Sequence, residues 1–144
     1  MSIKYVVACD GSPASERAVA FAIDHARHNG GAVLIAHVLE WSPYSFLTPE
    51  ELEERHMRRG EELVRAKTAL IDPILASIST DGVEVDSVIK YGHVAETLAD
   101  IAIEAGATQI VIGRTGQSSL KVRVFGSVAG TLAQIAPVPC TIVP

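Results

Sequence analysis

The sequence has few cysteines and aromatic residues and fewer basic than acidic side chains, and each shortage narrows the class of protein. Aromatic residues make up 5% of the 144 positions, so we expect an aliphatic, alanine-rich core. Twelve Lys and Arg against seventeen Asp and Glu give a net charge of −5, which would repel a polyanion over most of the surface. Nucleic acid and anionic membranes are therefore not expected as partners.

The sequence also lacks long apolar runs and a cysteine framework. Its longest apolar runs, such as Ala32 to Leu39, are too short to cross a bilayer. The N-terminus lacks the charged-then-apolar pattern of a secretory signal, so we expect a cytoplasmic protein. Cys9 and Cys140 lie inside strand-like apolar runs, where a thiol behaves as a small hydrophobe, and both are predicted to be inert.

Common signatures of nucleotide and hydrolase sites are missing as well. There is no Gly-x4-Gly-Lys-Ser/Thr and no Gly-x-Gly-x-x-Gly after the first strand, which excludes the P-loop and the dinucleotide fingerprint. The stretch from Gly126 to Gly130 places its serine one position too early for a Gly-x-Ser-x-Gly elbow. The five histidines are scattered without acid or cysteine clusters at ligand spacing, so no metal site is predicted.

Strand-like and helix-like segments alternate regularly along the chain. Apolar, β-branched runs predict strands over 3–9, 32–39, 83–90, 108–112 and 137–143. Four helices are predicted between them, the first capped by Ser12 and stopped by Asn29 to Gly31, the last opening at Ser127. Parallel strands joined by right-handed helical crossovers give a doubly wound α/β fold with helices on both faces. We expect a single domain over residues 1–144 with strand order 3-2-1-4-5.

The second helix is expected to be long and divided in character. It begins at a capping box formed by 48–51, and its first half, 50–62, is a charge run predicted to be a solvated face with i,i+4 acid–base pairs or a partner-binding surface. Pro73 should kink or split the helix. Its second half carries a packing stripe made of Leu63, Ala66, Leu70, Ile74 and Ile78.

A candidate anion site follows from where two strands end. In the predicted order, strands one and four are neighbours, and the crevice of such a sheet lies at the carboxyl ends of its strands. Asp10 follows strand one, and Gly113 ends strand four before a loop that continues through Gly116 to Gly126 and Ser127. Glycines let backbone N–H groups approach a phosphate, and the helix start adds further donors. Alternatively, the glycines form an ordinary loop and cap, and Asp10 only organises the turn after strand one.

These residues resemble the universal stress protein family, in its ATP-binding branch. The resemblance is carried by Gly113-x-x-Gly116, nine residues and Gly126-Ser127, by the opening from Val7 to Ser12, and by the closing segment from Val128 to Val143. It covers the whole chain except the region around Trp41 to Arg59.

The resemblance implies an ATP site and a dimer. It places adenine near Val38 and ribose on Asp10, and it implies a homodimer through the last strand, Val138 to Val143. Mg²⁺ or Mn²⁺ would bind through the phosphates. The nucleotide-binding residues predicted in this way are Asp10, Val38, Ile112, Gly113, Arg114, Gly116, Gly126, Ser127 and Val128. A side chain at Gly113, as in Gly113→Val, is expected to abolish binding by blocking a phosphate.

The sequence favours a nucleotide-binding regulator of the stress response over an enzyme. No general base, Walker acid or water-positioning group can be named. The alternatives are a slow ATPase or self-phosphorylating enzyme, with Ser118, Ser119 or Ser127 as acceptor, and a ligand-free dimer that acts as an interaction module. A protein client, if there is one, is expected to bind the region from Trp41 to Gly60.

Overall fold

A five-stranded parallel sheet forms the centre of the chain, as the sequence predicts. The computed structural model describes residues 3–40, 49–115 and 127–144. The strand order is β3-β2-β1-β4-β5, which confirms the predicted fold class. The strands are β1 (Lys4–Ala8), β2 (Ala32–Glu40), β3 (Glu84–Gly92), β4 (Gln109–Gly113) and β5 (Cys140–Val143). The last strand starts later than predicted because Pro137 and Pro139 have no N–H to donate to a ladder.

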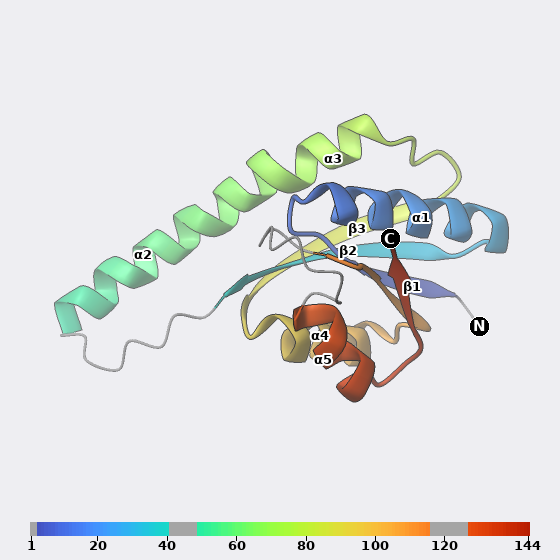
Figure 1. The fold of residues 1–144 in the computed structure, drawn as a ribbon. Helices are drawn as coiled ribbons and strands as arrows, with labels where there is room; N and C mark the ends of the chain where they lie inside the picture. The colour runs from blue at the N-terminus through green and yellow to red at the C-terminus, as the bar shows by residue number, and fades with distance from the viewer. Residues whose placement is uncertain (1–2, 41–48, 116–126) are drawn as a thin grey trace.

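Helices cover both faces of this sheet, as Figure 1 shows. They are α1 (Pro13–Asn29), α2 (Pro49–Ala66), the π-helical turn η1 (Lys67–Ile71), α3 (Asp72–Ser77), α4 (Val94–Ala105) and α5 (Ser127–Ile135). Helices α1 and α4 both end at a glycine in the left-handed conformation, Gly30 and Gly106. Within the described residues, no helix is long and apolar enough to cross a membrane.

Side chains on successive strand positions enter two separate hydrophobic clusters. On β1, Val7 lies in a cluster with α1 and α3 residues, and Val6 lies in the cluster on the α4–α5 face. Both valines are 0% exposed. A strand buried on both faces explains why its sequence is continuously apolar instead of alternating. Edge strand β3 is only half-buried, in agreement with its alternating sequence.

The long second helix is split by the π-helical turn that precedes Pro73. The N–H of Asp72 bonds to the carbonyl of Lys67, which inserts one residue into the helical repeat. This shift adds Ile71, which the predicted stripe omits, to the buried side of the helix at 0% exposed. Ile74 is buried as predicted, whereas Leu70 is partly buried. The capping residue predicted at the start, Thr48, lies outside the described residues.

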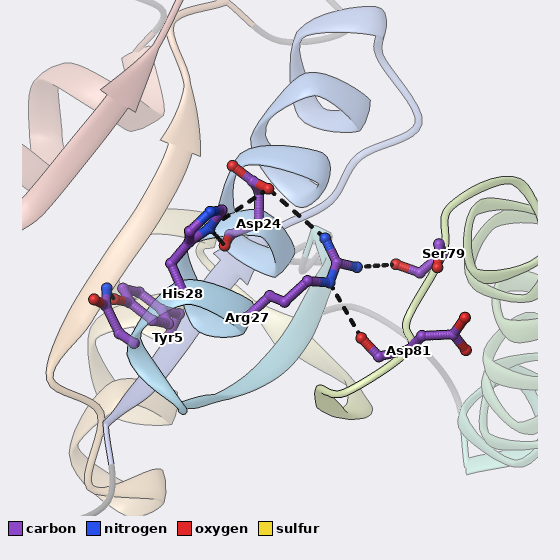
Figure 2. Close-up of polar contacts among 7 residues, drawn as sticks. Tyr5, Asp24, Arg27, His28, Ser79 and Asp81 are labelled. Atoms are coloured by element: carbon purple, nitrogen blue, oxygen red, sulfur yellow. Dashed lines mark hydrogen bonds and ion pairs between the residues drawn. The ribbon is translucent and has the colours of Figure 1, made fainter.

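Polar contacts fix α2 and α3 to the rest of the chain. Arg27 at the end of α1 donates from Nη2 to the carbonyl of Ser79 at 2.7 Å and from Nε to that of Asp81 at 3.1 Å, which holds the loop after α3 (Figure 2). At α2, the Tyr91 hydroxyl donates to Glu62. Desolvation and this hydrogen bond raise the pKa of Tyr91 to about 12, so the hydroxyl remains a donor at neutral pH.

Candidate functional site

Asp10 lies in the turn that joins β1 to α1, and its carboxylate shapes that turn. Its Oδ1 accepts the N–H of Ser12 at 2.9 Å, and its own N–H donates to Ser15 Oγ at 3.3 Å. Gly11 between them has φ +84°, a conformation that favours glycine. Asp10 therefore does organise this turn, as the alternative interpretation proposed. An ionised carboxylate accepts several hydrogen bonds, so this role is compatible with a contact to sugar hydroxyls.

Two buried serines cap the helix that follows Asp10. Ser12 Oγ accepts the N–H of Ser15 at 3.2 Å, which confirms Ser12 as the N-cap. Ser15 Oγ donates to the carbonyl of Ser12 at 2.9 Å and also receives the N–H of Asp10. The sequence analysis missed this role of Ser15. The only available signal was a second serine three residues after the cap.

Removing the cap should destabilise the turn. We expect Ser12→Ala to lower the free energy of unfolding by about 1 kcal/mol, because the N–H of Ser15 would lose its buried acceptor. Ser12→Thr keeps an oxygen at the capping position and is the matched control. Urea unfolding followed by circular dichroism measures both variants, and an unchanged midpoint in Ser12→Ala would show that the cap contributes nothing.

Gly113 ends β4 against the first turn of α1. A Cβ built on this residue would lie 2.9 Å from the carbonyl carbon and 3.0 Å from the carbonyl oxygen of Ala14. These are backbone atoms, which cannot rotate away as a side chain can. The fold therefore already requires a glycine at this position, for a reason independent of any phosphate.

Arg114 continues the pairing of β4 beyond its end. Its N–H donates to the carbonyl of Val143 on β5 at 2.8 Å, while its side chain is exposed. The backbone amide is thus used by the sheet and is not available to a phosphate. If Arg114 contacts a ligand, its guanidinium is the group that does so.

The ends of β1 and β4 lie side by side. The strands pair in parallel, with Val7 opposite Val111, so their carboxyl ends lie next to each other on the same side of the sheet. This arrangement brings the turn with Asp10 next to Gly113 and Arg114, as the sequence predicts. The first turn of α1 lies against Gly113 at this place.

Three predicted apolar site residues lie on one face of the sheet. Val38, near the end of β2, and Val128, in the first turn of α5, are half-buried and pack against the cluster on the α4–α5 face. Ile112 belongs to that cluster and is 6% exposed, so its side chain is a core group. Ser127 opens α5. The predicted residues Gly116 and Gly126, and the candidate acceptors Ser118 and Ser119, lie outside the described residues.

The surroundings of His37, Cys9 and Cys140 point to structural roles for these side chains. His37 Nδ1 lies 2.6 Å from the carbonyl oxygen of Cys9, and because a carbonyl can only accept, Nδ1 carries the proton. This contact joins β2 to the end of β1. Both cysteines are free thiols, and desolvation by burial raises the pKa of each. A raised pKa keeps them neutral at pH 7 and agrees with their prediction as inert.

The described part of the chain contains no group of three or more His, Cys, Asp or Glu side chains that could hold a metal ion. The structure places a carboxylate (Asp10), two partly buried valines (Val38 and Val128) and an exposed guanidinium (Arg114) near the carboxyl ends of the parallel strands.

Comparison with known proteins finds relatives that match almost the whole chain. The model of the universal stress protein family matches residues 1–144. The universal stress protein YxiE of Bacillus subtilis is 27% identical over 144 residues and covers 97% of each chain. The universal stress protein Rv1996 of Mycobacterium tuberculosis is 24% identical over 151 residues, 96% of this chain but 47% of its own length.

Solved structures show the same fold. The universal stress protein UspA of Lactobacillus plantarum has a TM-score of 0.72 at 22% identity, covering 99% of this chain and 97% of its own. A universal stress protein of Archaeoglobus fulgidus, solved with dAMP, has a TM-score of 0.62 at 26% identity, covering 99% and 98%. Another universal stress protein, solved with cAMP, has a TM-score of 0.65 at 23% identity, covering 99% and 97%.

Proposed function

Because the chain belongs to the universal stress protein family, we propose that it is a cytoplasmic, ATP-binding regulator of the stress response. The observation that carries the proposal is that Asp10 and Gly113 lie at the carboxyl ends of two neighbouring strands, β1 and β4. The dAMP complex of the Archaeoglobus fulgidus protein supports an adenine nucleotide as the class of ligand. The cAMP complex of a second protein of this fold supports the same class.

In this proposal the nucleotide crosses the ends of three strands. Adenine lies near Val38, whose partly buried side chain offers an apolar surface, and the ribose hydroxyls bond to Asp10. The phosphates lie over the loop from Gly113 to Ser127, where the start of α5 contributes unpaired N–H groups and a partial positive charge. Mg²⁺ or Mn²⁺ is held through the phosphates of the nucleotide.

The proposed assembly is a homodimer through Val138 to Val143. Strand β5 forms one edge of the sheet and pairs with β4. An edge strand offers backbone groups to a second strand, and pairing with its equivalent in another copy would cover them. A protein client on the region from Trp41 to Gly60 stays a prediction, because residues 41–48 lie outside the described part of the chain.

Freshly purified protein provides the direct test. We expect denaturation to release intact ATP, detected by mass spectrometry, and calorimetry on emptied protein to show tighter binding of ATP than of AMP. ADP that accumulates on incubation would instead indicate a slow ATPase, and phosphate found on a serine would indicate self-phosphorylation. Protein that is empty and binds no added adenine nucleotide would contradict the proposal and leave the ligand-free interaction module.

A further inference from the structure

Helix α2 has a side on which large apolar residues are exposed in the described part of the chain. Figure 1 shows α2 reaching outward beyond the end of the sheet. Leu63 and Ala66 are half-buried. On another side of the helix, Met57 is 72% exposed and Val64 is 64% exposed. These two residues are seven positions apart and therefore lie above one another on one face, which we call the outer α2 face.

A glycine lies between these two apolar residues. Gly60 lies in the middle of α2, where glycine lowers helix stability. Gly60 does not have a positive φ, so its backbone conformation does not require a glycine. A Cβ at Gly60 would meet nothing within 4 Å. Unlike Gly113, it is thus not needed for packing inside this chain. A glycine on an exposed helix face allows another helix to approach closely.

Charged residues flank the same face in an order that is complementary to itself. Within the described part of the chain, Glu54, Arg58, Glu61 and Arg65 are exposed and form no side-chain ion pair. The sequence predicts i,i+4 acid–base pairs within the charge run 50–62, and Glu54 and Arg58, which have that spacing, do not form one. Exposed pairs of this kind contribute little, so their absence needs no special cause. It leaves four charges available to a partner.

From this pattern we propose that two copies of the chain associate through an antiparallel pairing of their α2 helices, crossing at Gly60. Residues at similar distances before and after the crossing then lie opposite each other. Met57 of one copy meets Val64 of the other, and Glu54 meets Arg65. In antiparallel pairs, flanking positions on the same side of each helix face each other, which brings these charges together.

The occupant of this face is a second copy because the pattern is self-complementary. An unrelated acidic or basic partner would meet alternating charges and would be repelled by half of them. Two contacts in the second half of α2 hold its orientation: Arg59 lies over the ring of Tyr91, 5.3 Å from the ring centroid, and Glu62 accepts a hydrogen bond from the Tyr91 hydroxyl. The proposed β5 interface lies at the other edge of the sheet from β3, which α2 contacts, so both can form in one assembly.

Charge reversal tests the pairing without disturbing the fold, because both sites are exposed. A single helix pair is a small interface, so association is weak and is measured by sedimentation over a wide range of protein concentrations. Glu54→Arg and Arg65→Glu are each expected to weaken association about tenfold, because each puts like charges opposite each other twice. An equimolar mixture of the two single variants, and the double variant E54R/R65E, should both regain association.

Asp100→Arg on α4 makes the same charge change as Glu54→Arg on an exposed helix site and should have no effect. Gly60→Gln should weaken association while raising the melting temperature, since glutamine is the better helix former. Rescue in the mixture supports the second copy as occupant. Equal association of wild type and both single variants, or loss without rescue, overturns it. Because these variants lie outside the nucleotide site, nucleotide binding that persists in them separates this inference from the proposed function.

Discussion

Gly113→Val should destabilise the fold before it reports on any ligand. The Cβ of a new side chain would lie 2.9 Å from the carbonyl carbon of Ala14, so β4 and α1 must move apart. We expect a loss of about 1 to 3 kcal/mol in the free energy of unfolding for Gly113→Ala, and more for valine with its two γ-methyl groups. Urea unfolding measures both changes.

The matched control is the exposed Gly60, which has open space around its missing side chain. Gly60→Ala should raise stability by roughly 0.5 to 1 kcal/mol because alanine is the stronger helix former. If Gly113→Ala is as stable as the wild type, the close approach to Ala14 is not rigid, and Gly113→Val again becomes a usable test of phosphate approach.

Gly113 also shows what the sequence could and could not predict about the site. The sequence placed it correctly, at the end of a buried strand beside the turn with Asp10. The sequence pattern suggests a glycine required by a phosphate, whereas the structure gives a packing reason. Sequence patterns indicate that a side chain is excluded from a position, but they do not show which neighbour excludes it. In this chain the neighbour is the backbone of a helix about 100 residues earlier.

The fold was more predictable than the site because it depends on patterns that repeat. Continuous apolar runs, glycine stops and the capping Ser12 each mark an element locally, and handedness limits how the elements connect. The errors arose where one local event changed the repeat, such as the π-helical turn that brought Ile71 to the buried side. The bond from His37 to the carbonyl of Cys9 joins two strands, so no local pattern could show it.

Asp10→Asn should weaken ATP binding about tenfold or more while leaving the fold intact. The amide keeps an oxygen that can accept the N–H of Ser12, the contact that shapes the turn. It loses the charge, and hydrogen bonds to charged groups contribute about 1.5 to 3 kcal/mol. Asp10→Ala removes both functions, so it should lose binding and also lower the melting temperature. Calorimetry with ATP and thermal unfolding separate the two effects.

A change of ligand shows whether Asp10 acts on the ribose. The ratio of the affinities for ATP and 2′-deoxy-ATP should exceed one in the wild type, because the carboxylate of Asp10 bonds to the 2′-hydroxyl. In Asp10→Asn the ratio should fall toward one, because the coupling between the hydroxyl and the carboxylate is lost. Asp24→Asn makes the same charge change near the other end of α1, where Asp24 is exposed, and should leave both affinities unchanged. Unchanged affinities in Asp10→Asn would restrict Asp10 to the turn and mean that other residues bind the sugar.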